Sequence, residues 1–211
     1  MGNNSGKKSL WTRIKELFQG QKKTQKEQAD GGSIDFSQTE APPADLQFVK
    51  EFNKHGGKFL YCEKESEAHN YLNNISEESS INTIYCVNPE LCSQLKESGI
   101  EVTQKPSGAD AFYSDCEYLV SFNGGIMLTD RQTHGLKYTE LPEVFITKAR
   151  TSQITKNLSS ALSGIRAKYK GDIPSGISTV KGPRKKDSVT ELGGSQFINK
   201  EIYLLLVEDQ V

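Results

Sequence analysis

Apolar residues at helical spacing alternate with short, nearly continuous apolar runs along most of the chain. The first helix is predicted to begin at Asp45 as its cap and to end at the glycine pair 56–57. Its apolar face consists of Leu46, Val49 and Phe52. A strand then covers Lys58–Cys62. A second amphipathic helix follows, with the i, i+3, i+4, i+7 spacing of Ala68, Tyr71, Leu72 and Ile75.

Residues 81–87, INTIYCV, are apolar or β-branched nearly throughout, which is typical of a strand covered on both faces. Asn88 and Pro89 then supply an N-cap and a proline at the first helical position, and Gly99 ends that helix. Strand, helix and strand at this spacing predict βαβ units. We therefore expect a single α/β domain over residues 44–211, with a mostly parallel sheet flanked by helices.

The second half of the domain continues the alternation of helices and strands. Residues 109–117, ADAFYSDCE, are predicted to form a short helix. A long helix is predicted after it, capped by Thr151 or Ser152. Its core-facing stripe consists of Ile154, Leu158, Leu162, Ile165 and Tyr169. Further strands are predicted over residues 144–148, 176–180 and 201–207.

The stretch 115–130, DCEYLVSFNGGIMLTD, is the centre of the pattern. Two strand-like runs flank Asn123, Gly124 and Gly125. Adjacent glycines between strands permit a positive φ and a close backbone approach. This segment is therefore either a tight hairpin turn or a loop that faces a ligand.

A second glycine-containing loop, residues 181–187, follows another predicted strand and is rich in cations. Ligands of open α/β sheets bind beyond the carboxyl ends of parallel strands, and backbone amides near cations suit a phosphate or carboxylate. The loop matches neither common phosphate-loop pattern, and a solvated basic loop is the alternative. The candidate anion site comprises Asn123, Gly124, Gly125, Gly182, Arg184, Lys185, Lys186 and Asp187.

Catalytic residues are not recognisable from spacing. The central stretch contains Asp115 and Glu117, but nothing pairs with them along the sequence. Ser121 likewise has no identifiable base. An exposed surface carboxylate is expected for Glu117, with a general base or nucleophile as the alternative. No catalytic residue is therefore assigned, and whether the chain is an enzyme stays open.

Composition excludes several classes. The formal charge of −1 argues against a dedicated nucleic-acid binder. No run approaches the roughly 18 apolar residues of a membrane-spanning helix. The histidines lack metal-ligand spacing, so neither a metal nor another cofactor is expected. The cysteines form no CxxC pair, which favours buried, reduced thiols and a cytoplasmic protein. They are Cys62, Cys86, Cys92 and Cys116.

Residues 1–43 differ from the rest and are expected to form a flexible N-terminal tail. A short amphipathic helix over residues 9–18 places Leu10, Ile14, Leu17 and Phe18 on one face. The polar segment after it has no periodicity, so we expect a linker. The helix either packs on its own domain or frays, or it docks on a partner or a membrane surface.

The order of these pieces resembles the LUD-domain family, the group of lactate-utilisation protein C. Members open with Ala-Asp, found here at residues 109–110, and have a strand with AETGT, which corresponds to SFNGG at residues 121–125. Leu-Pro before a strand corresponds to residues 141–142. Their GPSRTADI segment corresponds to GPRKKD at residues 182–187. The resemblance covers residues 45–209.

The resemblance implies a fold of the NagB/RpiA/CoA-transferase-like α/β group. It also implies a cytoplasmic role in the oxidation of L-lactate to pyruvate together with iron–sulfur partner subunits. The clusters would belong to those partners, because the cysteines of this chain lack cluster-ligand spacing.

Departures from the family pattern affect the expected activity. Phe122 replaces the acidic residue of AETGT, Asn123 and Gly125 replace threonines, and the histidine of a later GVHGP-like turn is missing near Gly194 and Ser195. We therefore expect a non-catalytic or accessory subunit in lactate or related organic-acid oxidation. The alternative is a CoA-transferase-like enzyme or sensor that binds a phosphorylated or carboxylate ligand.

Overall fold

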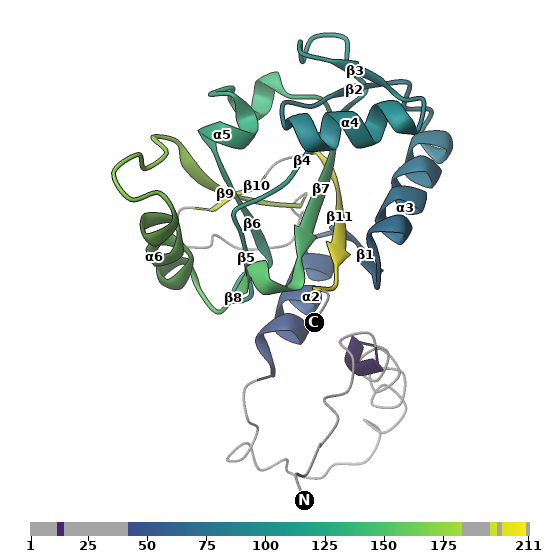
Figure 1. The fold of residues 1–211 in the computed structure, drawn as a ribbon. Coiled ribbons are helices and arrows are strands. Elements are labelled where there is room, and N and C mark those ends of the chain that lie inside the picture. Colours follow the sequence, from purple (N-terminus) through teal and green to yellow (C-terminus); the bar gives the residue numbers. More distant parts are fainter. Residues whose placement is uncertain (1–11, 15–41, 183–194, 198–199, 210–211) are drawn as a thin grey trace, which may run out of the picture.

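A six-stranded parallel sheet forms the centre of the protein in a computed structural model, which describes residues 12–14, 42–182, 195–197 and 200–209 (Figure 1). All five strand pairings in it are parallel, as the βαβ pattern predicts. In spatial order the strands are β1 (Lys58–Cys62), β11 (Glu201–Val207), β7 (Val144–Arg150), β4 (Ala111–Ser114), β2 (Thr83–Tyr85) and β3 (Glu101–Thr103).

Helices α3 (Glu65–Glu78) and α4 (Pro89–Glu97) cover one face of this sheet. α3 packs on β1 and β11, whereas α4 packs on β3. The predicted start of α4 is confirmed, because Asn88 Oδ1 accepts hydrogen bonds from the backbone N–H groups of Glu90 and Leu91. The two helices thus lie over opposite edges of the sheet.

The other face is covered by α2 (Ala44–Lys54) and a second sheet, with α6 (Leu158–Lys168) packed on the outside (Figure 1). This five-stranded sheet was not predicted. Its two central pairings, between β5 and β6 and between β6 and β9, are antiparallel. In spatial order its strands are β10 (Ser195–Phe197), β9 (Ile177–Lys181), β6 (Gly125–Thr129), β5 (Tyr118–Val120) and β8 (Ile154–Thr155).

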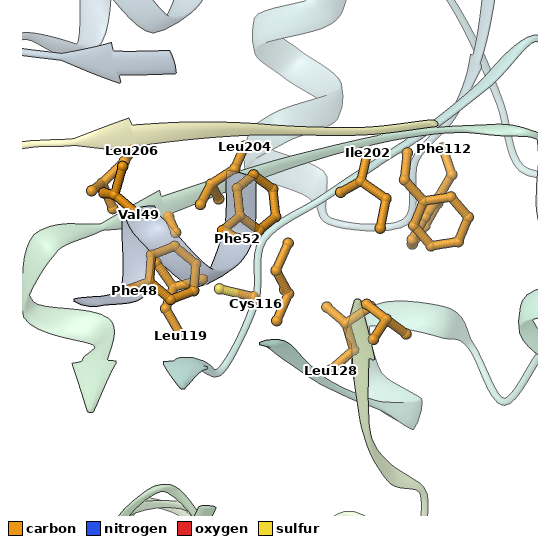
Figure 2. Packing of buried hydrophobic residues seen from close by; sticks show 14 of the residues in the cluster. Phe48, Val49, Phe52, Phe112, Cys116, Leu119, Leu128, Ile202, Leu204 and Leu206 are labelled. Atoms are coloured by element: carbon orange, nitrogen blue, oxygen red, sulfur yellow. The ribbon is translucent and has the colours of Figure 1, made fainter. Parts of the chain in front are cut away.

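The largest hydrophobic cluster lies between the two sheets (Figure 2). α2 contributes Phe48, Val49 and Phe52, which are fully buried. Ile14 also belongs to this cluster and is 2% exposed, so part of the N-terminal segment packs on the domain. The remainder of residues 1–41 lies outside the described residues, and its flexibility stays a prediction.

The helix predicted over residues 109–117 is wrong. This segment contains β4, which pairs with β2 and β7, and all four strand residues are buried. Its polar residues and the absence of a β-branched residue suggested a helix. Burial between two neighbouring strands outweighs that weak local preference.

The start predicted for the last helix, with Thr151 or Ser152 as its cap, is also wrong. α6 begins at Leu158, and Asn157 caps it by accepting a hydrogen bond from Ser160 N–H at 2.9 Å. Ile154 lies in β8, paired with Leu119 of β5. The first helix departs in a smaller way: Pro43, not Asp45, occupies the N-cap position. Asp45 instead forms a two-bond ion pair with Arg13.

The four cysteines are free and buried, as predicted. Burial raises the pKa of Cys62 to about 12, which makes a structural thiol rather than a reactive one. Across the described residues, no helix combines the length and the apolar character needed to cross a lipid bilayer.

Candidate functional site

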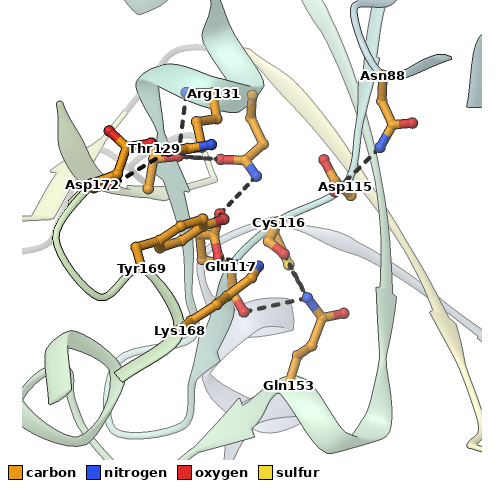
Figure 3. Close-up of polar contacts among 11 residues, drawn as sticks. Asn88, Asp115, Cys116, Glu117, Thr129, Arg131, Gln153, Lys168, Tyr169 and Asp172 are labelled. Atoms are coloured by element: carbon orange, nitrogen blue, oxygen red, sulfur yellow. Dashed lines mark hydrogen bonds and ion pairs between the residues drawn. The ribbon is translucent and has the colours of Figure 1, made fainter. Parts of the chain in front are cut away.

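Glu117 lies at the carboxyl end of β4, where the chain leaves the parallel sheet to enter β5 (Figure 3). Its side chain is fully buried, so the expected exposed carboxylate is wrong. Lys168 Nζ donates to Oε2 at 2.8 Å, while Tyr169 Oη and Gln132 Nε2 donate to Oε1 at 2.7 and 3.0 Å. A single carboxylate therefore joins the end of α6 and the short helix α5 (Asp130–Thr133) to the strand connection.

The donors keep Glu117 ionised. Burial alone would raise its pKa, but the hydrogen bonds from Lys168, Tyr169 and Gln132 outweigh burial and leave the pKa below its ordinary value. The orientation of Gln132 is fixed as well, because its Oε1 accepts hydrogen bonds from Thr129 N–H and Oγ1 at 2.9 and 2.6 Å. Glu117 is thus a preorganised acceptor with no proton to donate at neutral pH.

Asp115, two residues earlier, has the opposite electrostatic environment. Burial, and next the negative charge of Glu117, raise its pKa above the ordinary value. Among the described residues, Asn88 Nδ2 donates a side-chain hydrogen bond to Asp115 Oδ2 at 3.4 Å. Two carboxylates whose environments push their pKa values apart are the usual basis of an acid–base pair. Asp115 is therefore the more readily protonated member of this pair.

A cationic and aromatic layer covers the outer side of Glu117. Lys168 Nζ and the Arg131 guanidinium lie 4.8 and 4.5 Å from the centroid of the Tyr169 ring. Arg131 also pairs with Asp172, and both line an open surface cavity of about 490 Å³. Lys168, whose side chain is 55% exposed, connects the buried carboxylate to solvent.

These groups do not form a nucleophilic centre. Cys116 lies between the two carboxylates in sequence, but burial raises its pKa well above the ordinary value. Ser121 is fully buried, and its hydroxyl has no hydrogen-bond partner among the described residues. Within the described ranges, no group of three or more His, Cys, Asp or Glu side chains could hold a metal ion.

Gly124 of the predicted anion site contacts α2, and Gly182 contacts the turn that follows it. Gly124 has φ +62°, and a Cβ atom on it would lie 2.4 Å from the backbone N of Phe52. A Cβ on Gly182 would lie 2.4 Å from the carbonyl oxygen of His55. Since β6 pairs with β9 through Ile126 and Val180, extending this antiparallel register by two residues places the two glycines opposite each other.

Gly124 and Gly182 therefore both lie against the C-terminal end of α2 and the turn after it, and the positive φ and close approach expected at Gly124 serve packing within the protein. Asn123 Oδ1 accepts a hydrogen bond from Gly125 N–H at 3.1 Å, which fixes the hairpin turn. Arg184, Lys185, Lys186 and Asp187 lie outside the described residues. The anion site stays a prediction.

Sequence reasoning missed Lys168, Tyr169 and Gln132 as partners of Glu117. They are 51, 52 and 15 residues away in the chain, so no local spacing reveals them. The available signal was a lysine followed by a tyrosine at the end of an amphipathic helix. That signal identifies neither the acceptor nor the distance.

Comparisons with known proteins agree with this fold. A family model described as the LUD domain matches residues 46–207. The fold is similar to that of a DUF162 family protein from Deinococcus radiodurans, solved by crystallography at 1.70 Å. The TM-score is 0.54 at 15% sequence identity, and the match covers 78% of this chain and 95% of the other. At this identity the likeness concerns the fold alone. No curated protein matches the sequence.

Proposed function

The chain belongs to the LUD-domain family, and from this membership we propose that it is a non-catalytic or accessory subunit in the oxidation of lactate or a related organic acid. It would act in the cytoplasm with iron–sulfur partner proteins. The observation that carries the proposal is the family match over residues 46–207. The saturated hydrogen bonding of Glu117 supports a subunit without its own nucleophile.

Affinity purification of the tagged chain from its own host tests the partners. We expect iron–sulfur proteins to co-purify and to give the preparation a visible absorbance that the chain alone lacks. A deletion strain should grow poorly on L-lactate and normally on glucose, and the wild-type gene should restore growth. Recovery of no redox partner, together with unchanged growth on lactate, would contradict the proposal.

A second candidate function is a CoA-transferase-like enzyme or sensor that binds a phosphate or carboxylate. The position of Gly124 opposite Gly182 favours it, because a shared site requires that the two glycines lie close together. The basic residues after Gly182 would supply the cations. Lactate, pyruvate, sugar phosphates, nucleotides and CoA esters should be compared for their effect on the melting temperature.

The triple substitution Arg184, Lys185 and Lys186→Ala should abolish any stabilisation that such a ligand produces. A matched control replaces three exposed lysines elsewhere, Lys50, Lys64 and Lys96, with alanine and changes the net charge equally. If both triple variants respond to the ligand like the wild type, the binding site is not at this loop.

A further inference from the structure

A cavity of about 200 Å³ lies between α3 and α4 on the face of the parallel sheet opposite α2. Its floor includes Tyr113 of β4 and Lys148 of β7, the two strands at the centre of the sheet. Glu65 and His69 of α3 line one side, and Gln94 of α4 lines the other. α3 packs over β1 and β11, and α4 packs over β3. The cavity therefore lies over the centre of the sheet, between the two helices.

Tyr113 is only 2% exposed, and its hydroxyl makes no hydrogen bond to any other described residue. The hydroxyl itself opens on the cavity, where water or a ligand can accept its hydrogen bond. Burial raises the pKa of Tyr113 well above its ordinary value, so the phenol is neutral and retains its proton. The cavity therefore contains an oriented donor that lacks an acceptor.

Lys148 contributes a positive charge to the lining of the same cavity. Its side chain is 12% exposed, and its Nζ lies 2.5 Å from Glu65 Oε2 and 3.3 Å from Gln94 Oε1. An ammonium group has three N–H donors, and these contacts account for two. Glu65 is balanced independently, because Arg150 Nη2 lies 2.6 Å from its Oε1. Lys148 can thus donate to a further acceptor without leaving Glu65 unpaired.

We propose that this cavity binds the anion of a small organic acid, whose carboxylate accepts hydrogen bonds from Tyr113 Oη and Lys148 Nζ. A carboxylate supplies two acceptor oxygens on one carbon and a charge that complements the ammonium. A cavity of about 200 Å³ is large enough for an acid of a few carbons. This site goes beyond the proposed function and is separate from the glycine loops.

Titration of the ¹⁵N-labelled full chain with sodium acetate, propionate and L-lactate, followed by NMR at constant ionic strength, tests the proposal. Saturable shifts are expected at amides of α3, α4 and β4. Acetamide, a neutral molecule of similar shape, and methylammonium should produce none. A carboxylate response confined to other parts of the chain, or no saturation at concentrations on the order of 0.1 M, would overturn it.

Tyr113→Phe removes only the hydroxyl and should weaken carboxylate binding about tenfold, the typical effect of losing one hydrogen bond to a charged group. Its melting temperature should equal or exceed that of the wild type, because no protein hydrogen bond is lost. Tyr71→Phe, on α3 but outside the cavity lining, is the control and should bind normally. Unchanged affinity in Tyr113→Phe contradicts the proposal.

A second variant keeps the test independent of the buried tyrosine. Ser66 is exposed and lines the cavity, so Ser66→Phe should block it with little effect on folding. Loss of the acetate shifts in this variant supports the site. Retention of the shifts in both Ser66→Phe and Tyr113→Phe places the binding elsewhere.

Discussion

Glu117 and Lys168 form an ion pair with sharply unequal exposure: the carboxylate side chain is 0% exposed and the lysine side chain 55%. The Nζ to Oε2 distance is 2.8 Å. Solvent therefore reaches this pair only from the lysine side. The ion pair therefore stabilises the protein through the charge of Glu117, a buried group that accepts hydrogen bonds from Gln132 of α5 and Lys168 of α6.

The pH dependence of stability should report on Glu117. Its pKa is lowered in the folded state, so its contribution is complete above the ordinary value of 4.5 and is lost as pH falls through the lower folded pKa. Denaturant unfolding of wild type and Glu117→Gln should therefore differ most near pH 7. The difference should shrink below about pH 4.5. A constant difference across this range would show that charge is not the cause.

Lys168→Met should lower the free energy of unfolding by about 1–2 kcal/mol at pH 7, because the buried carboxylate loses its charged donor but keeps Tyr169 and Gln132. The matched control is Lys170→Met, an exposed lysine two residues later, which should change stability by less than about 0.5 kcal/mol. Urea unfolding of both variants is the measurement. Equal free energies of unfolding for the two variants would refute a stabilising role of the ion pair.

Gly124→Ala should destabilise the protein by about 3 kcal/mol, the combined effect of a left-handed backbone and a clash with α2. Gly108→Ala separates the two contributions, because Gly108 has φ +86° but no atom within 4 Å of the added Cβ. Gly108→Ala should lower the free energy of unfolding by only about 1 kcal/mol. A Gly124→Ala loss no greater than that of Gly108→Ala would show that α2 moves aside at little cost.

Ile14→Ala should lower the free energy of unfolding by about 2–4 kcal/mol, because this side chain is buried against the largest hydrophobic cluster. Ile173→Ala is the control, since that side chain is 51% exposed and its loss should cost less than about 1 kcal/mol. Thermal and urea unfolding distinguish the two. An Ile14→Ala protein as stable as the wild type would favour a helix that is available to partners.

Much of the parallel sheet was predictable because strands such as β11, in which six of seven residues are buried, read as continuous apolar runs, whereas β4 was predicted as a helix. Residues 58–62 and 201–207 were predicted with the bounds that the structure has. In the second sheet, the runs that flank the turn at residues 123–125 were predicted as strands and form the antiparallel pair of β5 and β6, but the two-residue β8 and the sheet as a whole were not predicted. Short strands depend on tertiary pairing, which a local pattern does not contain.

The candidate site was less predictable than the fold. The sequence drew attention to Asp115 and Glu117, yet their chemistry depends on Lys168, Tyr169 and Asn88, which approach from α6 and from the turn before α4. Only the three-dimensional fold reveals that one carboxylate is saturated with donors and the other is not. Tyr113 lies in the segment that was predicted as a helix, so the sequence pattern did not indicate that this residue lines a cavity.

The strand order has a consequence for synthesis on the ribosome. β11 is the last described strand in the chain, yet it lies between β1 and β7, with Lys58 paired to Tyr203. Until it emerges, β1 and β7 each present an unpaired apolar edge, the kind of template on which nascent chains aggregate. Any slowing of synthesis before β11 has left the ribosome would therefore prolong the dependence on chaperones.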